Sequence, residues 1–398
     1  MTERGRTAAG RWASAGALAG ALLLASAACG GGAGVAVDSM AAVRPEPLGL
    51  DLLSYRWKWV STDRRQEVRP QEFAAAAVWA DTIYLGGARG EFVALRASDG
   101  QPRWSKRLGA VHAAPTVARG LLYVGTADGI LVCLDALSGE ERWRYASQGP
   151  IGQAPVVAGN LVLFGNEADQ VFALDALTGA YKWKYKGETP EEYTLRGHAG
   201  LAVADDLAFT GFANGTLVAL RLDTGSVAWS TSLREDQDRF VDIDGTPVVL
   251  GGTVYATASS GGLYALDVST GLVRWRTPFF DAAAPSTTGA TGALSTDGER
   301  LFVAAADLGV YALDLDGNVL WRQGTRGGGE PAAPVVWGKL VIYSLARDGM
   351  YLADRRTGEI YEFFNPGEGT AVPTVTADGQ LYVLSNRGVL YAFDLDDV

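Results

Sequence analysis

A short pattern that recurs along the chain restricts its fold more than any other feature of the sequence. In each copy an apolar segment ends in Asp, a turn follows that ends in Gly, and Trp stands four residues after that Gly. Clear copies end at Trp143, Trp183, Trp275 and Trp321, and looser copies end at Trp104, Trp229 and, with tyrosine in the aromatic place, Tyr361. The intervals between successive aromatics are 39, 40, 46, 46, 46 and 40 residues. A period in this range is typical of a four-stranded propeller blade.

Each copy divides into four expected strands. In the second copy these are residues 114–117, 121–125, 130–135 and 141–145. The Asp-x-x-Ser/Thr-Gly segment suits a tight turn, because Gly accepts a positive φ and Asp bonds the local backbone. We interpret the Trp on the outer strand as core packing against the neighbouring blade.

The number of blades depends on the two ends of the chain. Seven copies end in an aromatic, and an eighth begins at residue 372 and lacks an outer strand. A matching strand is found near the start, since Arg56-Trp57-Lys58-Trp59 is similar to Arg142-Trp143-Arg144-Tyr145. The sequence therefore predicts an all-β, eight-bladed β-propeller with four antiparallel strands per blade, whose last blade is closed by the N-terminal strand. Such closure removes open sheet edges.

The first 28 residues predict an export signal, because arginines are followed by the uncharged stretch 13–28. That stretch is shorter than the roughly 20 residues of a membrane span and has the usual length for a secretory signal. The small residues directly before Cys29 resemble a bacterial lipobox, in which Cys29 would carry the lipid. The alternative is ordinary signal cleavage that leaves Cys29 as a free thiol. We expect a lipoprotein signal at 1–28, the lipidated cysteine and a flexible tether at 29–50, and the propeller at 51–398.

Composition argues against several function classes. The net charge of −11 disfavours nucleic acid as a partner, because phosphate binding needs a basic surface. The two histidines, His112 and His198, occupy equivalent positions in blades that are separated by a whole blade, so we expect no metal site and no catalytic triad. We also expect no cofactor. Cys133 lies in an apolar run and is predicted to be a buried small hydrophobic residue.

The repeat resembles that of the pyrroloquinoline-quinone propellers, a group that includes both enzymes and non-enzymes. Fold alone therefore does not decide function. The quinoprotein dehydrogenases usually have an adjacent Cys-Cys pair, and some carry a Cys-x-x-Cys-His haem motif. Neither occurs in this chain.

The whole mature chain more closely resembles the BamB family of lipoproteins of the outer-membrane protein assembly machinery. Two segments carry the resemblance, Tyr193-Thr194-Leu195-Arg196-Gly197 and the Asp-x-Asp-Gly-Thr-Pro stretch 242–247. The resemblance implies that these loops bind a BamA-like outer-membrane barrel subunit. The implied contact residues are Tyr193, Leu195, Arg196, Asp242 and Asp244.

Loop length points to the same surface. The three long intervals place their extra residues at 186–196, 233–242 and 277–289, each between an outer strand and the next inner strand. In a propeller these connections share one face, and binding residues are often found on loops held by a rigid scaffold. Neutral drift in loop length is the alternative, and Arg196 bracing against Asp242 or Asp244 is the alternative to partner contact.

The expected function is that of a non-catalytic scaffold in outer-membrane β-barrel assembly. We expect it to be anchored to the outer membrane through Cys29, to face the periplasm, and to bind a BamA-like subunit. The alternative is a small quinone- or sugar-binding periplasmic propeller.

Overall fold

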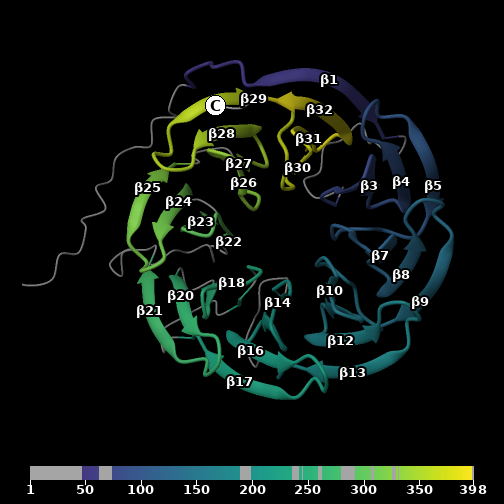
Figure 1. The fold of residues 1–398 in the computed structure, drawn as a ribbon, viewed down its shortest axis with the longest axis vertical. Helices are drawn as coiled ribbons and strands as arrows, with labels where there is room; N and C mark the ends of the chain where they lie inside the picture. The colour runs from purple at the N-terminus through teal and green to yellow at the C-terminus, as the bar shows by residue number, and fades with distance from the viewer. Residues whose placement is uncertain are drawn as a thin grey trace, which may run out of the picture. The chain divides into compact units, whose positions relative to one another are not determined.

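The computed structural model describes residues 47–61, 74–188, 199–234, 242–243, 245–258, 262–278, 292–305, 309–324, 329 and 331–396. These residues form eight antiparallel four-stranded sheets around a central opening (Figure 1). All of them belong to one compact unit, Met40–Val398. The predicted eight-bladed β-propeller is confirmed. No helix among the described residues is long and apolar enough to cross a membrane.

Each blade is described from its inner to its outer strand. Blades 1 to 4 are β2 (Ala77–Trp79), β3 (Thr82–Gly86), β4 (Glu91–Arg96), β5 (Pro102–Arg107); β6 (Thr116–Ala118), β7 (Leu121–Gly125), β8 (Ile130–Asp135), β9 (Glu141–Ala146); β10 (Val156–Ala158), β11 (Leu161–Asn166), β12 (Gln170–Asp175), β13 (Tyr181–Lys186); and β14 (Ala202–Ala204), β15 (Leu207–Gly211), β16 (Thr216–Arg221), β17 (Val227–Ser232). Blades 5 to 8 are β18 (Val248–Leu250), β19 (Thr253–Ala258), β20 (Gly262–Asp267), β21 (Val273–Pro278); β22 (Gly292–Thr296), β23 (Arg300–Ala305), β24 (Gly309–Asp314), β25 (Val319–Gln323); β26 (Val335–Trp337), β27 (Leu340–Ser344), β28 (Met350–Asp354), β29 (Ile360–Phe364); and β30 (Val375–Ala377), β31 (Gln380–Leu384), β32 (Val389–Leu395), β1 (Leu53–Val60).

The two middle strands of each blade supply most of the core. In blade 2 they are β7 and β8, which lie at the expected residues 121–125 and 130–135 and are almost wholly buried. They are apolar up to the terminal Asp135 because both faces of a blade pack against neighbouring blades. The inner strand starts two residues later than expected, at Thr116. Cys133 in β8 is a buried free thiol, as predicted.

The repeat Trp joins a blade to the next at seven of the eight junctions. The indole N–H of Trp143 donates to the carbonyl oxygen of Ala176 in blade 3 at 3.2 Å. The same ring lies against Gly179, where an added Cβ would come within 2.6 Å of it. Equivalent indole bonds to the residue that begins the next blade's turn are made by Trp57, Trp104, Trp183, Trp229, Trp275 and Trp321. Seven junctions between described blades are therefore closed by the same contact.

The junction between blades 7 and 8 differs, and here the expectation for Tyr361 is wrong by one residue. Strand pairing puts Glu362 opposite Leu352, which is the place that Trp275 takes opposite Ala265 in blade 5. The Tyr361 hydroxyl instead donates a hydrogen bond to the turn carboxylate of Asp354. In blade 5 the guanidinium of Arg274 donates the corresponding bond to Asp267. The interval of 40 residues hid this shift, since Glu362 is the residue that stands four after the turn glycine Gly358.

Blade 8 is closed by the N-terminal strand, as predicted. β1 pairs with β32 from Leu53 opposite Leu395 to Val60 opposite Val389, and Figure 1 shows β1 (purple) along the outside of β32 (yellow). The Glu362 carboxylate accepts the backbone N–H groups of Leu52 and Leu53 at 2.5 and 3.1 Å. In the other blades a turn joins the third strand to the outer strand, and the Trp of the preceding blade packs on that turn. In blade 8 the outer strand is β1, and the Glu362 carboxylate holds the backbone at its start.

Candidate functional site: the outer-to-inner connectors

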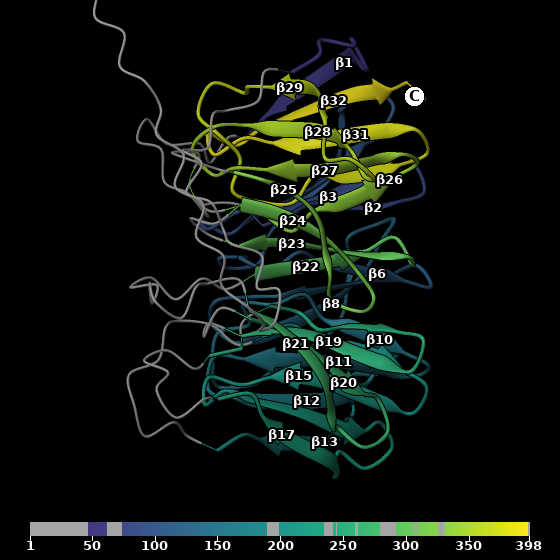
Figure 2. The same cartoon turned by 90° about the vertical axis from the view of Figure 1, so that its left-hand side faces the viewer.

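The connectors between outer and inner strands leave the propeller beside the turns that join the two middle strands. In blade 2 the first residue after the outer strand, Ser147, donates its N–H to the carbonyl oxygen of Gly129 in that turn. The same bond is made in blades 1, 3, 4 and 8 by Leu108, Gly187, Leu233 and Ser61. Because this bond repeats, these connectors start on one face of the ring. Figure 2 shows the blades edge-on, with the strands running between the two faces.

Three of these connectors return to the core through an apolar anchor. Val111, Ile151 and Ile243 are fully buried. They press on the glycine that ends the second strand of the preceding blade: a Cβ at Gly211 would lie 2.1 Å from the Ile243 side chain. The backbone N–H of Ile243 also donates to the carbonyl oxygen of Phe212 at 3.3 Å. The end of the connector from β17 is thus fixed on blade 4.

Phe212 also fixes the start of the preceding connector. Gly187, the residue after β13, lies against the Phe212 ring, and an added Cβ would be 2.8 Å from it. Tyr185 packs on the same ring, with 5.7 Å between centroids. One buried residue in blade 4 therefore contacts the bases of both connectors that contain the sequence-predicted contact residues. The sequence pattern did not identify Phe212 as a functional residue, because it lies in a turn outside the recurring Asp–Gly–Trp pattern.

The segment after Ile243 is wedged between blades. A Cβ at Gly245 would meet the Thr257 hydroxyl at 2.3 Å and the carbonyl oxygen of Gly292 at 2.5 Å. The Thr257 hydroxyl donates to that same carbonyl at 2.5 Å. Only glycine fits this place, which accounts for Gly in the Asp-x-Asp-Gly-Thr-Pro segment.

Of the predicted contact residues the structure places one. Asp242 is fully buried at the base of its connector. Cys29, Tyr193, Leu195, Arg196 and Asp244 lie outside the described residues. The assignment of all six stays a prediction.

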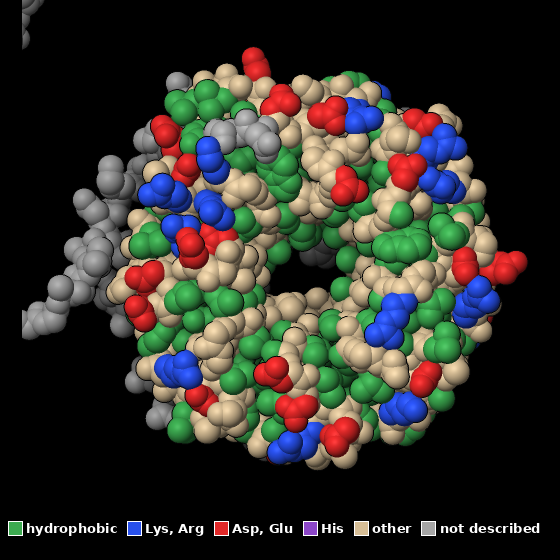
Figure 3. Space-filling view, in the orientation of Figure 1, with side chains coloured by type: hydrophobic (Ala, Val, Ile, Leu, Met, Phe, Trp, Pro, Cys, Tyr) green, Lys and Arg blue, Asp and Glu red, His purple; other side chains and the backbone are tan. Residues whose placement is uncertain are grey.

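The described part of the channel wall is uncharged along its eight inner strands. None of the eight inner strands contains a charged residue between the bounds given above, and pyrroloquinoline quinone is a tricarboxylate that needs cationic or strong hydrogen-bonding partners. On the face shown in Figure 3 mainly hydrophobic and uncharged atoms border the central opening. Within the described ranges no three His, Cys, Asp or Glu side chains are grouped to hold a metal.

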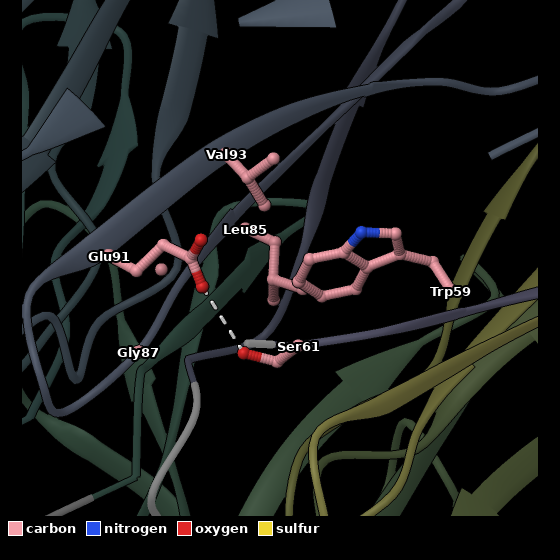
Figure 4. A pocket seen from close by; sticks show the side chains of 7 residues that line it. Trp59, Ser61, Leu85, Gly87, Glu91 and Val93 are labelled. Atoms are coloured by element: carbon pink, nitrogen blue, oxygen red, sulfur yellow. Dashed lines mark hydrogen bonds between the residues drawn. The ribbon is translucent and has the colours of Figure 1, made fainter. Parts of the chain in front are cut away.

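One small hollow lies where blade 8 meets blade 1 (Figure 4). Trp59, Leu85 and Val93 form its apolar side, and the Ser61 hydroxyl donates to Glu91 at 3.4 Å on the other. Its volume of about 10 Å³ holds one water molecule at most. Ligand pockets are commonly about 300–1,000 Å³, so this hollow does not fit a cofactor or a sugar.

The turn carboxylates of the repeat are occupied locally. Asp135 accepts the backbone N–H of Ser138 at 3.0 Å and pairs with Arg142 at 2.6 Å. The hydrogen bond from Arg142, and then that from Ser138, lower the pKa of Asp135 to about 2. This acid holds its own turn.

Comparison with known proteins identifies the family and supports the propeller fold. A family profile described as outer membrane protein assembly factor BamB matches residues 54–131, 106–291 and 260–397. The BamB of Escherichia coli (strain K12) is 28% identical over 214 residues, which cover 50% of each chain. The BamB of Alkalilimnicola ehrlichii is 30% identical over 209 residues, 51% of this chain and 52% of that one. The matches span about half the length of these relatives.

Solved structures show the same fold. The crystal structure of BamB from Moraxella catarrhalis has a TM-score of 0.72 and 22% identity, and covers 86% of this chain and all of that one. The quinohemoprotein alcohol dehydrogenase of Comamonas testosteroni has a TM-score of 0.68 and 16% identity, over 87% and 77% of the two chains. At these identities both show the fold alone. Because the family profile matches most of its length, the chain belongs to the BamB family of outer membrane protein assembly factors.

Proposed function

We propose that the chain is a non-catalytic scaffold lipoprotein in the assembly of outer-membrane β-barrels. Residues 1–28 serve as its signal, Cys29 carries the lipid, residues 29–50 tether the propeller at 51–398, and the propeller faces the periplasm. Its partner is a BamA-like subunit, bound through the connectors that enter and leave blade 4. The names of its relatives support a role in outer-membrane protein assembly. The contacts of both connectors with Phe212 support the choice of these two connectors as one binding surface.

In this proposal the contact residues have different roles. Tyr193, Leu195, Arg196 and Asp244 contact the partner. The full burial of Asp242 supports a bracing role for that residue, which holds the connector base against Ile243 and Phe212. Arg is favoured in such contacts because its planar guanidinium makes paired hydrogen bonds to carboxylates or carbonyls.

The test is the double variant Leu195→Ala with Arg196→Ala in the full lipoprotein. We expect an unchanged melting temperature and loss of co-purification of the barrel subunit from gently solubilised membranes. His112→Ala is the matched control, because His112 is exposed on the connector between β5 and β6. Wild-type recovery of the barrel subunit by the folded double variant would exclude these contacts. A fall in melting temperature shared with Asp244→Ala would assign Arg196 to bracing.

A further inference from the structure

The outer strands of the eight blades each pair on one side only, so their other edge carries backbone groups with no strand beside it. Such edges recruit other strands unless charge, proline or a covering segment protects them. Six of the described outer strands contain exposed Lys or Arg: β1, β5, β9, β13, β21 and β25. A seventh, β29, is covered at residues 360–361 by the backbone N–H groups of Leu48, Gly49 and Leu50.

Among these outer strands β17 has neither protection. Its sequence is Val-Ala-Trp-Ser-Thr-Ser, with no charge, no proline and no chain bonded along its outer edge in the described residues. Trp229 is turned inward onto blade 5, and the Thr231 hydroxyl donates to the carbonyl oxygen of Gly271 at 2.7 Å. What remains exposed is Val227, Ser230 and Ser232, a row of small neutral side chains beside the edge.

The position after the repeat Trp shows how unusual this is within the chain. It holds Lys58, Arg144, Lys184, Arg276 and Arg322 in five outer strands, and Ser105 in β5, where Lys106 and Arg107 follow. In β17 it holds Ser230, with Thr231 and Ser232 after it. The blade fold therefore accepts a cation at this place, and β17 has none there.

We infer that β17 is a docking edge for an extended, uncharged strand of an outer-membrane protein during its assembly. Strand addition satisfies the edge backbone groups of both chains. A membrane-spanning strand is about 9–11 residues long and keeps charge off its lipid-facing side. Beside β17 such a strand desolvates no charge, whereas beside the other outer strands it would desolvate a Lys or Arg or meet a covered edge.

This inference rests on the proposed function and adds the substrate to it. The connectors proposed to bind the barrel subunit enter and leave the same blade, and the one after β17 begins at Leu233, the residue that follows the docking edge. A strand on β17 would thus lie next to the machinery that inserts it.

The test uses the full-length protein with Cys29→Ser and a terminally blocked ten-residue peptide of alternating valine and threonine. We expect the peptide to bind and to slow hydrogen exchange in residues 227–232. Ser230→Lys with Ser232→Lys gives β17 the cations that β13 carries as Lys184 and Lys186, and we expect at least tenfold weaker binding with an unchanged melting temperature. Ser105→Lys in β5 is the matched control and keeps wild-type binding.

The same peptide with alternate amides N-methylated probes the backbone, and we expect it not to bind. Equal binding by the wild type and the Ser230/Ser232 variant, or binding of the methylated peptide, would overturn the inference. Absence of binding to the wild type at millimolar peptide would do the same. Dimerisation that the two lysines abolish would assign the edge to a second copy of this chain and also overturn it. Because no barrel subunit is present, these results are independent of the co-purification test.

Discussion

At the scale of single residues, the propeller depends on a glycine that leaves space for the tryptophan of the preceding blade. Gly179 has a φ of +72°, and its missing side chain is the space that Trp143 occupies. The requirement is therefore double: a left-handed backbone and no Cβ. The indole then reaches the backbone carbonyl of Ala176, so one contact supplies apolar burial and a satisfied N–H.

This gives a prediction that separates the two requirements. Gly159 has a φ of +56° and nothing within 4 Å of an added Cβ, so Gly159→Ala adds only backbone strain, about 1–2 kcal/mol. Gly179→Ala adds the clash with Trp143 as well, which we expect to cost a further ~1–3 kcal/mol. Urea unfolding of the two variants measures the difference. Equal losses would show that Trp143 moves aside freely.

The roles of single residues could be predicted from the sequence where a residue type has one common role. Trp beside a turn glycine has few uses other than packing, so its place was correctly assigned in seven blades. Asp242 shows the limit. Its neighbours read as a polar loop, and only the three-dimensional position of Ile243 on Gly211 and Phe212 explains why it is buried.

At the scale of elements, the junction between blades 7 and 8 has a carboxylate in the place where the other junctions have a tryptophan ring. Glu362 receives two backbone N–H groups from the start of β1. Burial raises the pKa of Glu362, and the two N–H groups oppose that rise. The sequence-based assignment chose Tyr361 because it is an aromatic residue three positions after Gly358, one position short of the repeat spacing. Counting from Gly358 finds Glu362, but only the pairing with Leu352 shows which residue faces blade 8.

We predict that Glu362→Ala loosens the first strand, while Glu362→Gln does not. Alanine leaves the N–H groups of Leu52 and Leu53 without acceptors, at a cost of about 1–3 kcal/mol for a buried donor. Glutamine keeps an acceptor oxygen and removes the charge whose burial is unfavourable. Hydrogen exchange in residues 48–60 reports the effect, with faster exchange expected in the alanine variant alone. Identical exchange in both variants would show that pairing of β1 with β32 holds the strand without Glu362.

At the scale of the whole molecule, ring closure makes every blade depend on two neighbours. The core among the described residues consists of eight clusters of buried residues, and each cluster is shared between two adjacent blades. One cluster joins Tyr382 and Leu390 of blade 8 to Ile83 and Leu95 of blade 1, with Trp57 packed against it. The strand β1 therefore completes both a sheet and a core.

The last prediction tests whether β1 acts as an ordinary outer strand that happens to come first in the sequence. Deleting residues 47–60 exposes the edge of β32 and the core surface that the half-buried Trp57 covers. Loss of a fully buried Trp costs roughly 3–5 kcal/mol, which is an upper bound for this residue. We expect that variant to aggregate. A circular permutant is the control: a short glycine-containing turn joins Asp396 to Leu52, whose backbones already bond at 3.0 Å, and new ends open at the exposed turn Gly251–Gly252. Because it keeps β1 beside β32, the permutant should melt cooperatively within a few degrees of the parent. A soluble deletion variant with the parent's melting temperature would show that the ring does not need its closing strand.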